Sequence, residues 1–76
     1  MDEDYKGHHI KLIARQLPDS GRWIVRVVIN WTKGSHGEFR QFDVKRGFAT
    51  DEDAVQAGLT FAKEWIDHGK PRIRQN

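Results

Sequence analysis

The apolar residues between Thr50 and Ile66 recur at the spacing of one helical face. At about 100° per residue they fall on a single arc, and polar residues take the opposite arc. The members of the apolar arc are Val55, Gly58, Leu59, Phe61, Ala62, Trp65 and Ile66. Thr50 stands at the expected N-cap with Asp53 three residues later, and Gly69 and Pro71 follow the last apolar residue. The pattern predicts one amphipathic helix over this stretch.

Before the helix, β-branched and aliphatic residues predict three strands, at 8–17, 23–31 and 38–44. The second strand alternates most clearly between apolar and polar positions. Its bulkier face, which we expect to pack against the helix, carries Trp23, Val25, Val27, Ile29 and Trp31. A glycine in mid-helix costs about 1 kcal/mol relative to alanine. We therefore expect Gly58 to mark a close approach of the helix to these large side chains.

The two other strands have weaker patterns. In the first strand, the residues that can face the core are Ile10, Leu12 and Ala14. In the third, Phe42 and Val44 share one face, while Phe39 points to the other unless a bulge intervenes. The segment Lys45–Gly47 is expected to turn the chain toward the helix.

The order strand, strand, strand, helix predicts an α+β fold, a three-stranded antiparallel β-meander packed against one C-terminal α-helix. We expect one domain over residues 8–69, since 76 residues are too few for two cores. Residues 1–7 and 70–76 show no periodicity. We expect the first to be a flexible N-terminus and the second a flexible basic tail.

Composition favours a soluble, cytoplasmic setting. The chain has no cysteine, so it forms neither disulfides nor thiolate metal sites. No apolar run approaches the roughly 18 residues of a membrane-spanning helix, and the acidic start, MDEDY, is unlike a signal peptide. We expect no membrane association.

Charge is distributed unevenly along the chain. Residues 5–50 contain nine Lys or Arg against three Asp or Glu, whereas 51–67 contain one Lys against five acids. A polyanion such as DNA should therefore meet the sheet and not the helix. Chance segregation of charges on a small surface is the alternative.

Neither catalytic nor metal-binding groups cluster in the sequence. Adjacent His8 and His9 point to opposite faces of a strand, and no histidine spacing is typical of a zinc site. The acids at 51–53 suit the dipole of a helix N-terminus. No nucleophile, base and acid stand together, and no Gly-rich phosphate loop is present. We expect a non-enzymatic domain without metal, cofactor or small-molecule substrate.

The sheet face that points away from the helix is the remaining candidate for function. By alternation it carries Lys11, Ile13, Arg15, Ile24, Arg26, Val28 and Asn30. Arg40 joins them if the third strand has the matching phase.

Three interpretations of this face stay open. Its Lys and Arg side chains can contact phosphates, and Arg or Asn can read base edges, so nucleic-acid binding is one. Its charges can also be solvated groups that only keep the edge strands soluble. Finally, Ile13, Ile24 and Val28 can form an exposed apolar strip that binds a protein partner or a second copy.

Three stretches resemble the plant ethylene-response-factor DNA-binding domain, namely Tyr5–Gly7, Gly21–Arg26 and Gly47–Ala54. The resemblance covers about residues 5–66 and preserves the order of elements. It implies a three-stranded sheet in the major groove, with strand Arg and Trp side chains making the contacts. The positions that it implies are Lys6, Arg22, Trp23, Arg26 and Arg40.

The same order of elements, with a T-x-x-[DE]-A start to the helix, is also similar to HicB-type antitoxin domains. That resemblance implies binding to a toxin protein. The two resemblances agree on topology and differ on the partner.

Overall fold

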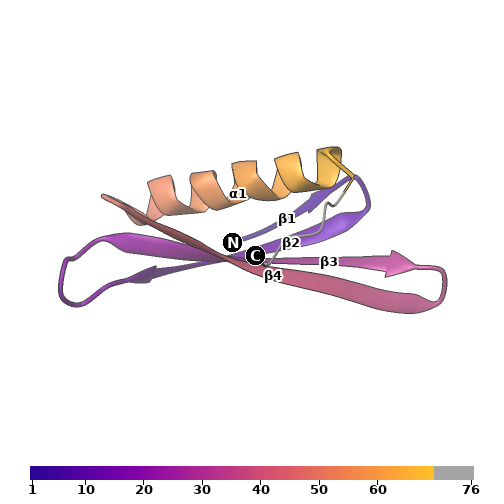
Figure 1. Ribbon diagram of the computed structural model, residues 1–76, viewed down its shortest axis with the longest axis horizontal. Helices are drawn as coiled ribbons and strands as arrows, with labels where there is room; N and C mark the ends of the chain where they lie inside the picture. Colours follow the sequence, from indigo (N-terminus) through magenta and orange to yellow (C-terminus); the bar gives the residue numbers. More distant parts are fainter. Residues whose placement is uncertain (70–76) are drawn as a thin grey trace, which may run out of the picture.

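Four antiparallel strands and one helix form the part of the chain that the computed structural model describes, residues 1–69. The elements are β1 (Asp2–Tyr5), β2 (His8–Gln16), β3 (Trp23–Lys33), β4 (His36–Phe48) and α1 (Asp51–Asp67). The sheet order is β1-β2-β3-β4, so each strand pairs with its neighbours in sequence. Figure 1 shows α1 lying along one face of the twisted sheet. The fold is therefore α+β, with two layers.

Strand β1 lies in the segment 1–7, where the sequence predicts no regular structure. The prediction of three strands is therefore wrong by one strand. β1 pairs antiparallel with β2, with Tyr5 opposite His8. Lys6 and Gly7 join the two strands and have φ values of 48° and 77°. Positive φ at both positions is what a two-residue type I′ hairpin turn requires. The predicted basic tail, 70–76, lies outside the described residues.

The first two predicted strands are confirmed as β2 and β3, whereas β4 is longer than predicted. β4 begins at His36 and includes the segment Lys45–Gly47, which the sequence pattern indicated as a turn. There the register with β3 changes, because Trp23 lies opposite Phe48 while Val25 lies opposite Val44. Three β4 residues thus face one β3 residue, as in an extended bulge.

The core lies between α1 and the face of the sheet that carries the alternating apolar residues. Its buried side chains from the sheet are Ile10, Leu12, Val25, Val27 and Ile29, and from the helix Ala54, Leu59, Ala62, Trp65 and Ile66. The predicted helix-facing side of the second strand is confirmed, since Trp23 and Trp31 also pack against this cluster. A Cβ on Gly58 would lie 3.0 Å from Cδ2 of Leu12. The expected close approach at Gly58 is therefore present.

Thr50 caps α1 as the sequence predicts. Its extended backbone lets the hydroxyl oxygen accept a hydrogen bond of 3.1 Å from the backbone N–H of Asp53. We expect Thr50→Ala to lower the free energy of unfolding by about 1 kcal/mol, because one helix N–H loses its acceptor. Thr50→Ser keeps the hydroxyl and should restore most of the loss. Urea unfolding followed by far-ultraviolet circular dichroism would test this, and equal loss in both variants would contradict it.

Asp67 ties the β1–β2 hairpin to the end of α1. Its carboxylate accepts hydrogen bonds from the Tyr5 hydroxyl at 2.9 and 3.0 Å and from Lys6 Nζ at 2.7 Å. These donors lower the pKa of Asp67, the Lys6 ammonium most strongly, and the same contact raises the pKa of Lys6. A second ion pair, Lys63 to Glu3 at 2.9 Å, joins β1 to the helix.

The lowered pKa of Asp67 predicts a pH-dependent contribution to stability. The contribution is complete above the unfolded aspartate pKa of about 3.9 and is lost as the pH falls through the lower folded value. Asp67→Asn should therefore be less stable than wild type near neutral pH, and the difference should shrink to nothing in strong acid. Thermal unfolding of both proteins across this pH range would test it. A difference that is constant with pH would contradict the assignment.

Candidate functional site

The face of the sheet opposite α1, here called the open face, is not covered by any element within residues 1–69 (Figure 1). Strand register and alternation assign its residues. They are Asp2 and Asp4 from β1; His9, Lys11, Ile13 and Arg15 from β2; Ile24, Arg26, Val28 and Asn30 from β3; and Phe39, Gln41, Asp43 and Lys45 from β4.

Six of the sequence-predicted site residues share this face. They are the cations Lys11, Arg15 and Arg26 and the apolar residues Ile13, Ile24 and Val28. The alternation of β2 and β3 was enough to place them. Their roles in binding remain predictions.

Two candidate nucleic-acid contacts lie elsewhere, namely Arg40, which was expected here only if the third strand had the matching phase, and Arg22, which the resemblance to the plant domain implied. Arg40 pairs with Ile29, a core position, and its guanidinium lies 5.8 Å from the ring centroid of Trp31. It therefore points to the helix side of the sheet. Arg22 precedes β3 and its side chain lies against Gly47, where a Cβ would be 2.7 Å from Arg22 Cδ. Arg22 thus covers the β4 bulge and is not on a strand.

The positions implied by the plant DNA-binding domain do not form one surface. Lys6 is in the β1–β2 turn and is bound to Asp67, while Trp23 is partly buried against the core. Of the five implied positions, Arg26 is the one that lies on the open face. The positions which that resemblance implies are therefore dispersed over the β1–β2 turn, the β4 bulge, the helix side of the sheet and the open face.

Acidic side chains make the open face less basic than the sequence predicts. Arg26 Nε donates to Asp43 Oδ1 at 2.9 Å, and the hydrogen bond lowers the pKa of Asp43 and raises that of Arg26. Asp2 and Asp4 stand opposite Lys11 and His9. These acids could not be placed from the sequence, because β1 was not predicted and the phase of the third strand was open.

An apolar row crosses the open face obliquely. Phe39 on β4 is a diagonal neighbour of Val28 on β3, and Val28 is a diagonal neighbour of Ile13 on β2. Such neighbours lie about 7–8 Å apart, within reach of long side chains. Phe39 is 59% exposed and Ile13 45% exposed. We call Phe39, Val28 and Ile13 the apolar diagonal, and Ile24 lies beside its Ile13 end.

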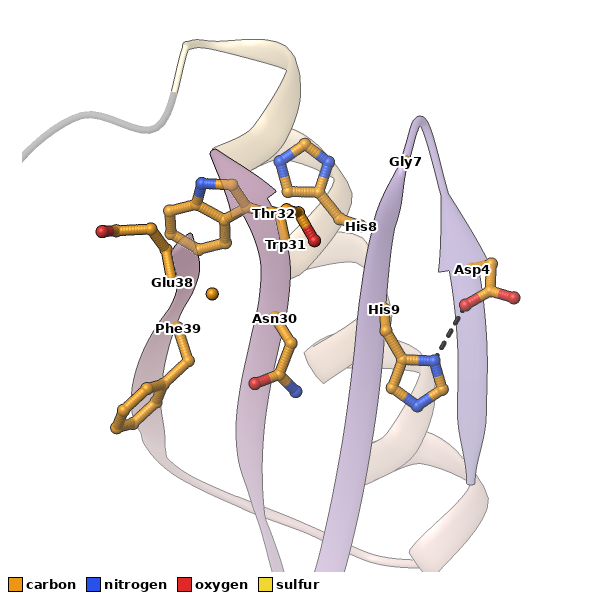
Figure 2. Close-up of a pocket in the computed structure, with 10 residues that line it drawn as sticks. Asp4, Gly7, His8, His9, Asn30, Trp31, Thr32, Glu38 and Phe39 are labelled. Carbon is orange, nitrogen blue, oxygen red and sulfur yellow. Dashed lines mark hydrogen bonds and ion pairs between the residues drawn. The ribbon is translucent and has the colours of Figure 1, made fainter. Parts of the chain in front are cut away.

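Figure 2 shows the Phe39 end of the open face, where His9, Asn30 and Phe39 form a row across three strands. His9 Nδ1 shares a 2.8 Å hydrogen bond with the Asp4 carboxylate. His8 lies instead beside Trp31, with ring centroids 5.5 Å apart. The two histidines thus point to opposite faces, as alternation predicts.

The described chain, residues 1–69, contains no group of three or more His, Cys, Asp or Glu side chains that could hold a metal ion. No helix within that range has the length and hydropathy needed to cross a membrane. In comparisons with known proteins, no protein family, no curated protein sequence and no solved structure matches the chain.

Proposed function

We propose that this chain is a non-enzymatic protein-interaction domain and that the open face is its binding surface. The observation that supports the proposal is the apolar diagonal on a sheet face that no described element covers. Ile13 and Phe39 are two of the large apolar side chains left exposed within residues 1–69. Full burial of such a side chain is worth about 1.5–3 kcal/mol. A partner surface that covers the diagonal would gain this free energy.

Nucleic-acid binding is the second candidate, because Lys11, Arg15 and Lys45 share the open face. The charge of the face as a whole favours it less. Binding through phosphates depends on cations whose charge is available to the backbone. Arg26 is instead paired with Asp43, and the acids of β1 stand beside Lys11. A nucleic acid on the open face would contact acidic as well as basic side chains, and also the exposed ring of Phe39.

Photocrosslinking in living cells tests the proposed binding surface. Phe39 is replaced by p-benzoylphenylalanine, a photoreactive analogue of similar shape, in the full chain. Irradiation is expected to give discrete adducts that contain a second polypeptide, identified by mass spectrometry. The matched control carries the same analogue at Thr60, which is exposed on α1.

Each outcome of the crosslinking experiment is decisive. Adducts from position 39 that are absent from position 60 support a protein partner on the open face. Adducts that nuclease removes would identify nucleic acid and overturn the proposal. Absence of any adduct from position 39, and from the same analogue at position 13, would also overturn it.

A further inference from the structure

We infer that the protein that covers the open face is a second copy of this chain, bound face to face about a two-fold axis along the apolar diagonal. The inference rests on the proposed function and names its partner. It is supported by the way in which charge is divided on the two sides of the diagonal.

One side of the diagonal, here called the acidic side, carries the two β1 acids and one lysine, a net charge of −1 with neutral His9. Its residues are Asp2, Asp4, His9, Lys11 and Asn30. The other, the basic side, carries three cations and one acid. Its residues are Arg15, Ile24, Arg26, Gln41, Asp43 and Lys45. Arg15, Asp43 and Lys45 line one shallow hollow on this side, so these charges are close together.

When a two-fold axis lies in the plane of an interface, a residue on one side of the axis faces the partner residue that lies at the same distance on the other side. With the axis along the diagonal, Phe39, Val28 and Ile13 of one copy cover the same row of the other. The acidic side of each copy then lies over the basic side of its partner, so the charge attraction occurs twice. Rotation about an axis perpendicular to the diagonal would instead place each side over itself. The surface is therefore self-complementary in one orientation only.

Strand geometry sets how the two sheets would cross. One step across the diagonal moves about 4.8 Å between strands and about 6.8 Å along them, so the diagonal runs roughly 35° from the strands. The strands of two copies would then cross at roughly 70°, near the orthogonal class of sheet packing. The face measures roughly 15 Å by 20 Å. Two such faces would cover about 600 Å² in total, less than a standard specific interface, so a weak and transient dimer is expected.

Sedimentation velocity of the full chain from micromolar to millimolar concentration tests the dimer. The sedimentation coefficient is expected to rise with concentration. Ile13→Lys should raise the dissociation constant by at least tenfold, because a charge would be buried in the apolar row on which the two copies meet. Thr60→Lys makes the same change of charge on α1 and should leave the dissociation constant unchanged. A monomer at all concentrations would overturn the inference.

Charge reversal tests the orientation of the two copies. Asp2→Lys with Asp4→Lys makes both sides basic, and Arg15→Glu with Lys45→Glu makes both sides acidic. Each double variant alone should dimerise at least tenfold more weakly than wild type, whereas an equal mixture should form a heterodimer of near wild-type affinity. Amide spectra of each variant report whether it is folded.

General attraction between oppositely charged proteins requires its own control. Glu52→Lys with Glu64→Lys and Lys33→Glu with Arg46→Glu make the same changes of net charge at exposed positions off the open face. A mixture of these two should dimerise like wild type. If it gains affinity on mixing as the open-face pair does, the orientation is wrong.

The inference and the proposed function fail in different ways. Adducts from position 39 to another protein, together with a chain that sediments as a monomer, would leave the proposed function standing and remove the second copy as partner. A dimer that Ile13→Lys leaves intact would mean that another surface joins the copies, such as the outer edge of β4, which no strand within residues 1–69 pairs. That result would overturn the face-to-face arrangement.

Discussion

Replacing Trp65 with alanine is expected to remove a large part of the free energy of unfolding of the protein. Trp65 is 7% exposed and lies between α1 and the sheet, where its ring meets Phe42 edge to face at 5.2 Å and Trp31 at 5.8 Å. Removing a buried aromatic side chain costs about 3–5 kcal/mol, because transfer free energy is lost and a cavity is left. A chain of 76 residues is typically stable by about 4–11 kcal/mol in all. One substitution would therefore consume a large part of the total.

The matched control for Trp65→Ala is Phe39→Ala, which removes an aromatic ring from an exposed position. It should change the free energy of unfolding of the monomer by less than about 0.5 kcal/mol. Trp65→Phe keeps part of the buried area and should fall between the two. Urea unfolding at low protein concentration, followed by circular dichroism, measures all three. Equal losses for Trp65→Ala and Phe39→Ala would show that the core is not where the structure has it.

Gly58→Leu is expected to be the next most destabilising change. A Cβ at this position would lie 3.0 Å from Leu12 Cδ2 and 3.1 Å from both Val25 Cγ atoms. Overpacking of a filled core costs about 1–3 kcal/mol and occasionally more. Leucine adds three further carbons beyond the Cβ, so α1 must lift from β2 and β3. We expect a loss at or above the upper end of that range.

The control for Gly58→Leu is Gln56→Leu, which adds an apolar side chain at an exposed position of the same helix. It should change the free energy of unfolding by less than about 0.5 kcal/mol. In Gly58→Ala, the gain in helix propensity of about 1 kcal/mol opposes the crowding of one methyl group. That variant should therefore lie close to wild type. Thermal unfolding of the three variants gives the ranking, and a Gly58→Leu protein as stable as Gln56→Leu would contradict the close packing.

The sequence predicted the elements that have a periodic pattern of apolar residues, namely α1, β2 and β3. The helix limits followed from Thr50 and Gly69, and the faces of β2 and β3 followed from alternation, which is clear in β3 and weaker in β2. β1 was not predicted, since its residues are mostly acidic and its stability comes from pairing with β2 and from contacts with Lys63 and Asp67. Such long-range contacts leave no periodic signal in four residues. The one local sign was the Lys6-Gly7 dipeptide, which suits a type I′ turn.

The candidate site was predicted in part for the same reason. The residues of the open face on β2 and β3 were identified, and those on β1 and β4 were not, because their strands were missed or uncertain in phase. The face of Arg40 was left dependent on the phase of the third strand, since a shift of one residue in phase moves a side chain to the other face. The acids that offset the positive charge, and the exposed ring of Phe39, come from these two strands. Whether the open face is mainly basic or mainly apolar therefore depends on β1 and β4, the two strands that were not predicted or whose phase was open.

Titration with a short DNA duplex of mixed sequence, followed by amide chemical shifts, tests most directly whether the open face binds a protein or a nucleic acid. The titration is made at about 50 mM and then about 200 mM salt, since phosphate contacts weaken steeply between these conditions. A protein-binding face predicts no cluster of shifts there at low salt. Any weak shifts should be scattered over cations on all sides of the molecule. Shifts clustered on Lys11, Arg15 and Arg26 that fade at the higher salt concentration would contradict it and identify the open face as a nucleic-acid surface.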